Sequence, residues 1–336
     1  MRAIGYQQPG NIDRDDALMD IDLPIPTAVG RDLLVEVKAV SVNPVDYKVR
    51  QGTPPEAGQW KVLGWDAAGI IKAVGPDVRL FSVGDQVFYA GTMNRSGTNA
   101  EFHLVDERIV GRKPQSLDWA AAAALPLTAI TAWEGLFDRL DVKRPVPGAA
   151  RAVVIIGGAG GVGSIAIQLA RKLTDLTVIA TASRQETKQW ALDMGAHHVI
   201  DHSQPIAAQV AALNLGAPAF VFSTTQTKQH SSEIADLIAP QGRFCLIDGI
   251  ADVSAFTRKS VSIHLEFMFT RPMFMTADVA EQGVLLNEVS RLVDAGVLRT
   301  TLTEQFSPIN AANLRRVHTL VESGKTRGKL VLEKFD

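Results

Sequence analysis

Apolar positions in the first third of the chain fall in short runs that end at glycine and proline turns. These runs cover residues 33–42, 69–74, 86–89 and 102–105. Turn sequences such as Gly75-Pro76-Asp77 separate them. Many short strands at this spacing are typical of an all-β sandwich or barrel. Residues 1–117 therefore predict a small β-domain.

From residue 118 the pattern changes to alternating strands and helices. The alanine-rich segment 119–124 favours a helix. The pattern that follows predicts strands at 152–156, 177–182, 198–201, 219–223 and 243–248, and helices at 162–173, 186–194, 206–213 and 231–238. Continuous apolar strands that alternate with helices indicate βαβ units in a parallel sheet covered on both faces.

After about residue 260 the order of elements changes again. The pattern predicts a strand at 261–269, a helix at 279–295, a strand at 300–306, a helix at 311–322 and a strand at 328–333. We expect this last part to return to the N-terminal domain and to close its β-barrel. The expected fold is therefore α/β, with a doubly wound parallel-sheet domain interrupting a β-barrel domain.

The composition fits two domains of a soluble, cytoplasmic protein. A chain of 336 residues, 46% of them hydrophobic, is too long for one ordinary core. Its 34 Lys and Arg residues nearly balance 36 Asp and Glu residues, whereas a nucleic-acid-binding protein usually shows a basic patch. The single cysteine, Cys245, excludes an intrachain disulfide and a cysteine zinc cluster. We see no secretory or transit pattern, and no apolar run of the ~18 residues that a membrane span needs.

The strongest chemical signal is a glycine-rich turn between the strand at 152–156 and the helix at 162–173. Its Gly158, Gly160 and Gly163 satisfy the G-x-G-x-x-G pattern of dinucleotide-binding turns. Glycines there allow a tight turn and a close approach to the pyrophosphate, which the helix N-terminus attracts. The predicted contacts are Gly158, Gly160, Gly161, Val162 and Gly163. The alternative is a glycine-rich loop with no ligand.

The end of the second strand favours NADP(H) over NAD(H). NAD enzymes usually carry an Asp or Glu about 20 residues after the glycines, where it binds the ribose. Here Ser183 and Arg184 follow the strand, and Lys188 lies one helical turn further on. These side chains can bind a 2′-phosphate. The alternative is that both cations are solvated surface charges.

The whole chain resembles the medium-chain dehydrogenase/reductase superfamily, and most of all its zinc-free quinone-oxidoreductase branch, whose members are often named zinc-type alcohol dehydrogenase-like proteins. The motifs that carry the resemblance lie at residues 42–47, 64–69, 83–87, 124–128 and 158–163. The resemblance implies a discontinuous GroES-like catalytic domain at 1–124 and 266–336. It also implies a Rossmann NADP-binding domain at 125–265 and a homodimer, in which a strand carrying Phe267–Phe269 pairs across the interface.

The departures from the family pattern concern zinc. Zinc-dependent members carry Cys, His-Glu and Cys at the positions of Asn43, Trp65-Asp66 and Leu127, and four cysteines in a lobe that residues 91–97 span here. Zinc needs Cys, His or carboxylate ligands. The resemblance therefore implies reduction without a metal, and hence an intrinsically electrophilic acceptor such as a quinone or an α,β-unsaturated carbonyl compound.

The resemblance and the strand ends also suggest individual site residues. Further cofactor contacts are expected at Asn43, Thr131, Ser223, Thr224, Asp248, Gly249 and Lys329, several of which follow predicted parallel strands. Tyr47 and Asn43 are the catalytic candidates, with Tyr47 contacting the acceptor oxygen or delivering a proton; the alternative for Tyr47 is a packing aromatic. The expected substrate pocket consists of Tyr47, Trp65, Phe267, Phe269 and Met273, which are equally typical of core or interface.

Asp46 and Asp66 form a possible acid/base pair, although one of them could instead cap a turn or pair with Arg50. Two other functions remain open from the sequence. One is a zinc-type alcohol dehydrogenase, and the other is a catalytically silent NADPH-binding protein.

Overall fold

The computed structural model describes residues 1–249 and 252–335, and the chain divides into two compact units. The first unit consists of Met1–Leu127 and Phe269–Asp336, and the second consists of Thr128–Met268. The last part of the chain thus belongs to the same unit as the N-terminal part, as the sequence predicts.

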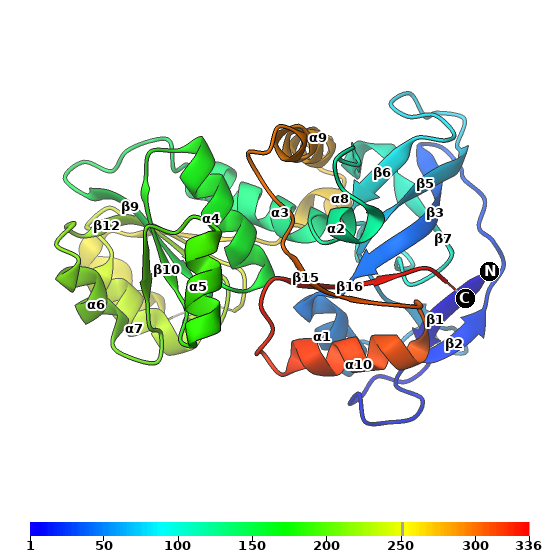
Figure 1. Ribbon diagram of the computed structural model, residues 1–336, viewed down its shortest axis with the longest axis horizontal. Coiled ribbons are helices and arrows are strands. Elements are labelled where there is room, and N and C mark those ends of the chain that lie inside the picture. The colour runs from blue at the N-terminus through cyan, green and yellow to red at the C-terminus, as the bar shows by residue number, and fades with distance from the viewer. Residues whose placement is uncertain (250–251, 336) are drawn as a thin grey trace. The chain divides into compact units, whose positions relative to one another are not determined.

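The first unit is built on β-sheet. Its seven-stranded sheet has the order β15-β16-β3-β5-β6-β8, with β7 paired to β3, and a three-stranded sheet has the order β2-β1-β4 (Figure 1). The strands are β1 (Arg2–Tyr6), β2 (Met19–Asp22), β3 (Asp32–Ser41), β4 (Lys61–Val62), β5 (Asp66–Val74), β6 (Gln86–Tyr89), β7 (Phe102–Asp106), β8 (Val110–Arg112), β15 (Leu302–Phe306) and β16 (Lys329–Glu333). The C-terminal strand β16 pairs antiparallel with β3, so the last segment joins the sheet of the N-terminal part.

The helices of the first unit lie at its N-terminal part and in its C-terminal segment. They are α1 (Pro44–Gly52), η1 (Glu107–Ile109), α2 (Trp119–Ala123), α8 (Thr270–Phe274), α9 (Glu281–Asp294) and α10 (Ala311–Glu322). Helix α1 begins at a capping arrangement in which the Asn43 backbone N–H donates to the Asp46 carboxylate at 2.8 Å, and Pro44 supplies the preset φ of the first turn. This helix follows β3 directly and fixes the positions of Asn43, Asp46 and Tyr47.

The second unit is a six-stranded, all-parallel sheet with the order β11-β10-β9-β12-β13-β14. Its strands are β9 (Ala150–Ile156), β10 (Thr177–Thr181), β11 (His198–Ile200), β12 (Pro218–Ser223), β13 (Arg243–Leu246) and β14 (Ser262–Leu265). Its helices are α3 (Pro126–Trp133), η2 (Glu134–Arg139), α4 (Gly161–Leu173), α5 (Gln185–Asp193), α6 (Ile206–Ala212), α7 (Thr227–Leu237) and η3 (Val253–Lys259), of which α3 starts at the end of the first unit. Helices α4 and α5 lie on one side of the strands, and α6 and α7 lie on the other (Figure 1). The doubly wound parallel sheet is thereby confirmed.

The expected strand at 261–269 is wrong in its second half. Strand β14 ends at Leu265, where its partner β13 also ends at Leu246. Beyond that point Glu266 is buried and accepts a hydrogen bond from Arg139 Nε at 2.8 Å. Phe267–Phe269 therefore lie outside the strand, in the turn that leads into α8.

One helical stretch corrects the expectation that no apolar run is long enough to span a membrane. Among the described residues, the 21-residue stretch Trp119–Arg139 is long and apolar enough to cross a membrane, judged by length and composition alone. Its most apolar window is 89% buried inside the protein, as in a core helix.

Candidate active site

The glycine-rich turn of the second unit joins β9 to α4. The backbone N–H groups of Gly157 and Gly158 donate to the side-chain and main-chain oxygens of Thr181, each at 3.0 Å, and so hold the turn against the end of β10. Gly160 is the N-cap of α4, and no side chain caps that helix. The first N–H groups of α4, at Gly161, Val162 and Gly163, have no carbonyl within the helix to bond. Free N–H groups at a helix N-terminus favour an anion.

A side chain at the glycines of the turn would meet different surroundings. A Cβ on Gly163 would lie 2.2 Å from the carbonyl oxygen of Gly157, and a Cβ on Gly158 would lie 2.7 Å from the Cβ of Ala180. These two positions allow helix and strand to approach. A Cβ on Gly160 would meet nothing closer than 3.5 Å. The turn is therefore open at Gly160, as a dinucleotide cradle requires.

Residues after β12 and β13 border the same turn. Thr224 Oγ1 donates to the carbonyl oxygen of Ile156 at 2.7 Å, and it would lie 2.6 Å from a Cβ on Gly157. Ser223 is fully buried and shares a hydrogen bond of 2.7 Å with the hydroxyl of Thr227. Asp248 accepts from the backbone N–H of Thr227 at 3.1 Å and also from its hydroxyl. Of these predicted cofactor residues, Ser223 and Asp248 thus already hold the start of α7.

Asp248 also explains why the sequence predicts the start of α7 too late in the chain. The sequence predicts a helix at 231–238, but α7 begins at Thr227. Asp248, which follows another strand, accepts hydrogen bonds from Thr227 in the first turn of α7, and local sequence does not reveal such a cap. Gly249, the next predicted contact, has φ +88° and open space around it, while Thr131 lies buried in α3.

The residues expected at a 2′-phosphate lie beside carboxylates. Arg184 pairs with Glu186 at 2.8 Å, and Lys188 pairs with Asp201 at 2.9 Å. Hydrogen bonds from Ser203 and then from Lys188 lower the pKa of Asp201 to about 2. Sequence analysis did not foresee Asp201, because it follows β11 and reaches Lys188 only in the folded sheet. No carboxylate occupies the residues directly after β10.

The first unit contains a buried group of charges around Asp66. The ammonium group of Lys329 donates to the carbonyl oxygen of Val42 at 3.0 Å, to Asn43 Oδ1, and to Asp66 Oδ2 at 3.1 Å. The Asn43 amide donates to Asp66 Oδ2 at 2.7 Å. Asp66 Oδ1 accepts the backbone N–H of Leu127 at 2.7 Å. We call Asn43, Asp46, Asp66 and Lys329 the buried polar cluster.

Burial pushes the charged members of this cluster toward their neutral forms. It raises the pKa of Asp66 and lowers the pKa of Lys329, although each charge stabilises the other. It raises the pKa of Asp46 to about 7, against the hydrogen bond from Asn43 and the charge of Lys329. The cluster holds two carboxyl groups and one amine. It can therefore store a proton near neutral pH.

This placement bears on three sequence-based expectations. Lys329 and Asn43 are 3% and 1% exposed, and the hydrogen bonds above use the three ammonium hydrogens of Lys329. Both side chains are bound within the first unit, and their contacts with a cofactor stay predictions. Arg50 does not pair with Asp46, because it donates to Glu322 and to the carbonyl oxygen of Gly10.

Tyr47 and the expected pocket residues are only partly brought together. Tyr47 is half-buried on α1, and burial followed by the charge of Glu322 raises its pKa. Trp65 and Phe269 pack against each other with ring centroids 5.7 Å apart. Phe267 belongs to the second unit and is 46% exposed, and Met273 is half-buried in α8.

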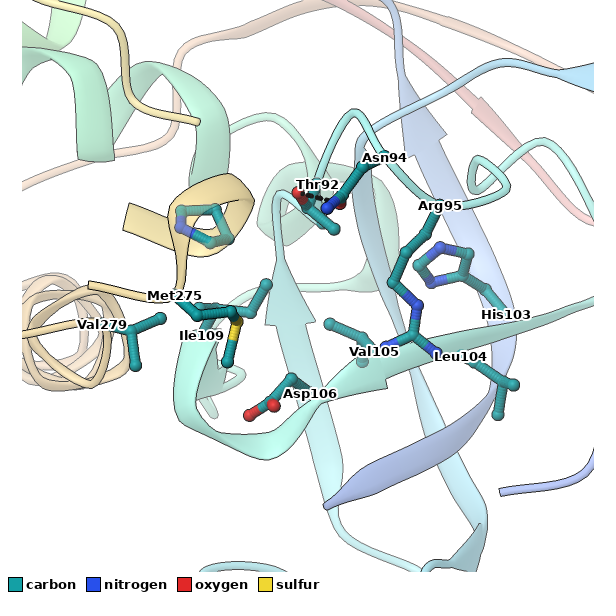
Figure 2. A pocket seen from close by; sticks show the side chains of 12 residues that line it. Thr92, Asn94, Arg95, His103, Leu104, Val105, Asp106, Ile109, Met275 and Val279 are labelled. Atoms are coloured by element: carbon teal, nitrogen blue, oxygen red, sulfur yellow. Dashed lines mark hydrogen bonds between the residues drawn. The ribbon is translucent and has the colours of Figure 1, made fainter. Parts of the chain in front are cut away.

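Sequence analysis missed a cavity of about 110 Å³ in the first unit (Figure 2). Its lining residues are Gly91, Thr92, Asn94, Arg95, His103, Leu104, Val105, Asp106, Ile109, Pro272, Met275 and Val279. They come from β7 and its flanking loops and from α8 with the loop after it. These segments are far apart in the sequence, so no local pattern announces the cavity.

The charged groups around the cavity are already paired. Arg95 forms two hydrogen bonds with the Asp32 carboxylate, at 2.8 and 3.0 Å, and Asp106 pairs with Arg108 at 2.8 Å. His103 contacts the hydroxyl of Tyr89 and the carbonyl oxygen of Ser96, and burial lowers its pKa to about 4, which keeps it neutral. The cavity is therefore suited to a neutral guest.

Two family models match the chain, the alcohol dehydrogenase GroES-like domain at residues 30–115 and zinc-binding dehydrogenase at residues 194–332. A zinc-type alcohol dehydrogenase-like protein of Staphylococcus aureus (strain MSSA476) is 39% identical to the chain, over 99% of both proteins. The chain belongs to the medium-chain dehydrogenase/reductase superfamily. It is accordingly an oxidoreductase of that superfamily.

Solved structures of superfamily members have the same fold. One from Rhizobium etli CFN 42, described provisionally as a zinc-dependent alcohol dehydrogenase, has a TM-score of 0.99 and 70% sequence identity, covering 100% of this chain and 98% of that one. The quinone oxidoreductase of Coxiella burnetii has a TM-score of 0.81 and 26% identity, covering 100% of this chain and 99% of that one. The resemblance to the medium-chain dehydrogenase/reductase superfamily and the GroES-like and Rossmann folds are thus confirmed.

The residues of this medium-chain dehydrogenase/reductase do not fit the zinc ion that several of these names imply. Of the expected ligand positions 43, 65, 66 and 127, Asp66 alone carries an ionisable oxygen, and the ammonium of Lys329 lies 3.1 Å from it. A dication there would meet the positive charge of that ammonium and find no Cys or His ligand. No group of three or more His, Cys, Asp or Glu side chains suited to a metal occurs among residues 1–249 and 252–335.

Proposed function

We propose that this protein is an NADPH-dependent, zinc-independent oxidoreductase that reduces quinones or α,β-unsaturated carbonyl compounds by hydride transfer. The observation that carries the proposal is the ammonium of Lys329, which donates hydrogen bonds to Asn43 and Asp66, at two of the positions where the family resemblance implies zinc ligands. Without a Lewis acid to polarise the acceptor, the acceptor itself must be electrophilic. The similarity to a quinone oxidoreductase supports this substrate class.

The dinucleotide is assigned to the second unit. The open glycine turn and the uncapped N-terminus of α4 fit its pyrophosphate. Arg184 and Lys188, with Ser183, would hold a 2′-phosphate, and the residues directly after β10 include no carboxylate that would favour NAD(H). When bound, the cofactor supplies a hydride.

The acceptor is assigned to the first unit, with Tyr47 as the candidate that contacts the acceptor oxygen or delivers the proton that accompanies the hydride. Its phenol is half-buried, and its raised pKa keeps it protonated at neutral pH. The role of Asn43 is to position the backbone at the start of α1 through Asp66 and Asp46. Asn43 therefore helps to hold the helix that carries Tyr47.

The proposed setting is the cytoplasm, and the proposed assembly is a homodimer. Strand β14 is at the edge of the parallel sheet, so its outer side is unpaired among the residues that the structure describes. Leu265 at its end is 60% exposed. An unpaired strand edge with an apolar residue is suited to pairing with a second copy.

The test is an acceptor panel, followed as NADPH oxidation at 340 nm with NADH as the comparison. We expect turnover of 1,4-benzoquinone or 2-cyclohexenone, with NADPH preferred and a simple aldehyde left unreduced. Replacement of Tyr47 by Phe should lower kcat while NADPH still binds. Binding of NADPH without turnover of any acceptor would instead indicate a silent binding protein.

A further inference from the structure

His202 lies beside the residues that we assign to the 2′-phosphate. Strands β10 and β11 pair in parallel, with Thr181 opposite Ile200. The ladder continues beyond this pair, because the backbone N–H of Ala182 donates to the carbonyl oxygen of Ile200 at 2.9 Å. Continued by one more residue, the register brings Ser183 opposite His202. The histidine is half-buried, so it stays accessible at the carboxyl end of the sheet, within the second unit.

A hydrogen bond connects His202 to the glycine-rich turn. Its Nδ1 lies 3.3 Å from Thr181 Oγ1, and the same hydroxyl oxygen accepts the backbone N–H of Gly157 at 3.0 Å. The ring of His230 in α7 packs beside it, with ring centroids 6.3 Å apart. Nε2, the other nitrogen of the His202 ring, bonds to no residue that the structure describes, and it is not enclosed. The imidazole is therefore held on one side and open on the other.

The charges already present around this place cancel. Arg184 pairs with Glu186 at 2.8 Å, and Lys188 pairs with Asp201 at 2.9 Å. These two cations and two carboxylates have no net charge, whereas a phosphate monoester carries a charge of about −1.5 to −2 at pH 7. An additional positive charge would therefore strengthen the binding of a 2′-phosphate. A histidine can gain one close to neutral pH.

The surroundings keep His202 neutral until an anion arrives. Burial lowers the pKa of its imidazole and so does the charge of Lys188, whereas the charge of Asp201 opposes them. Both oxygens of Asp201 are already bonded, Oδ1 to Ser203 and Oδ2 to Lys188. The titratable groups around the ring are Asp201 of its own segment, Lys188 of α5 and His230 of α7, with Glu233 and Asp248 acting on His230. Burial and then the charge of His202 lower the pKa of His230, so it stays neutral as well.

We propose that His202 binds the 2′-phosphate of NADPH as an imidazolium, and that NADPH binding therefore takes up a proton from solvent. The inference rests on the proposed function and adds to it a specificity residue and a regulation by pH. A nearby negative charge favours the charged form of an imidazole. By linkage, the proton favours binding of the phosphate to the same extent.

The sign of the pH dependence follows from this linkage. As the pH rises from about 6.5 to about 8.5, protonation of His202 becomes more costly, and the Kd for NADPH should increase by about fivefold or more. NADH lacks the 2′-phosphate, so its Kd should stay constant over the same range. The preference for NADPH over NADH should therefore be greatest at the acidic end.

The direct test is the number of protons that the full-length protein takes up when it binds NADPH at pH 7. Isothermal titration calorimetry in PIPES and in Tris measures this number, because the two buffers differ in their heat of ionisation. We expect the wild type to take up a fraction of one proton with NADPH and none with NADH. Equal uptake with the two dinucleotides, or no uptake with NADPH, would overturn the proposal.

Substitutions assign the proton to one side chain. His202→Gln should abolish the uptake. His202→Arg should also abolish it while NADPH binding stays tight at pH 8.5, because a guanidinium is permanently charged. His198→Gln, at the start of β11, is the matched control and should keep the wild-type uptake. Uptake that persists in His202→Gln would refute the role of His202. If that variant does not fold, the wild-type comparison of NADPH with NADH still decides.

Turnover separates this inference from the proposed function. Proton uptake through His202 without reduction of any acceptor would support the inference and refute the reductase. Reduction of 1,4-benzoquinone by NADPH, combined with NADPH binding that takes up no proton, would refute the inference and keep the reductase.

Discussion

Lys329 brings a positive charge into the interior of the first unit, where Asp66, Asn43 and a backbone carbonyl take up its hydrogen bonds. Isolated charges are very costly to bury, but a pair with satisfied hydrogen bonds can be tolerated. The residues that make the cluster are separated by 263 positions or more from Lys329. For that reason the sequence predicted Lys329 only as a cofactor contact, and the fold shows its partners within the chain.

Removal of the charge of Lys329 should therefore lower the stability of the fold, because it leaves a buried carboxylate unpaired. Lys329→Met leaves the Asp66 carboxylate buried without its cation, so the free energy of unfolding should fall by about 3–5 kcal/mol. The double variant Lys329→Met/Asp66→Asn should lose at least about 1 kcal/mol less than the sum of the two single variants. Urea denaturation measures all three. Lys334→Met, whose side chain is 76% exposed, is the control and should change stability by less than about 0.5 kcal/mol. Additive single effects would contradict the pairing.

Because of Asp46, the contribution of the buried polar cluster to stability depends on pH. Its pKa is about 7 in the folded protein and 3.8 for the ordinary side chain. A carboxyl whose pKa is raised by folding stabilises the fold at low pH, and this contribution is lost as the pH rises from about 4 to about 7. Asp46→Asn mimics the protonated form. Relative to wild type, its unfolding free energy should rise by more than about 1 kcal/mol from pH 5 to pH 8. A difference that stays constant with pH would refute the raised pKa.

At the scale of elements, the sequence predicted some bounds and missed others. Helix α10 (Ala311–Glu322) has the bounds that the sequence predicts, because its burial follows a clear helical period. The four-residue strand β6 (Gln86–Tyr89) also has the predicted bounds. Helix α1 was missed, although Asn43 followed by Pro44 is a helix-start signal. The β14 region was predicted too long, because the end of its partner strand decides where pairing stops.

The ends of β10 and β11 together determine the cofactor preference that we propose. Lys188→Ala should weaken NADPH binding about tenfold through loss of one charge-assisted contact and leave NADH binding unchanged. Asp201→Asn should tighten NADPH binding, because it releases Lys188 from the 2.9 Å ion pair. Fluorescence titration with both dinucleotides measures this. Lys172→Ala, an exposed cation in the last turn of α4, is the control. Equal effects on NADPH and NADH would argue against a 2′-phosphate contact.

At the scale of the whole molecule, the two-unit chain and its discontinuous first unit were accessible from the sequence, because strand and helix periods change at the unit boundaries. The cavity was not, because its lining residues come from β7 and its flanking loops and from α8 with the loop after it. Motifs thus revealed the glycine-rich turn, whereas the cavity needed the fold.

The proposed dimer makes a prediction at this scale. Leu265→Glu places a charge at the end of the unpaired edge of β14 and should shift the protein from dimer to monomer in sedimentation velocity. Val284→Glu, at a 59% exposed position of α9, is the matched control and should leave the dimer intact. A dimer that survives the Leu265 change would place the interface elsewhere.

The central claim is hydride transfer without a metal. Its most direct test is the rate of NADPH oxidation with 1,4-benzoquinone, measured on one preparation before and after exhaustive dialysis against EDTA, together with the zinc content of the protein. The account predicts an unchanged rate and less than stoichiometric zinc, since Lys329 fills the place beside Asp66. A rate that falls on dialysis and returns with added Zn²⁺ would contradict it.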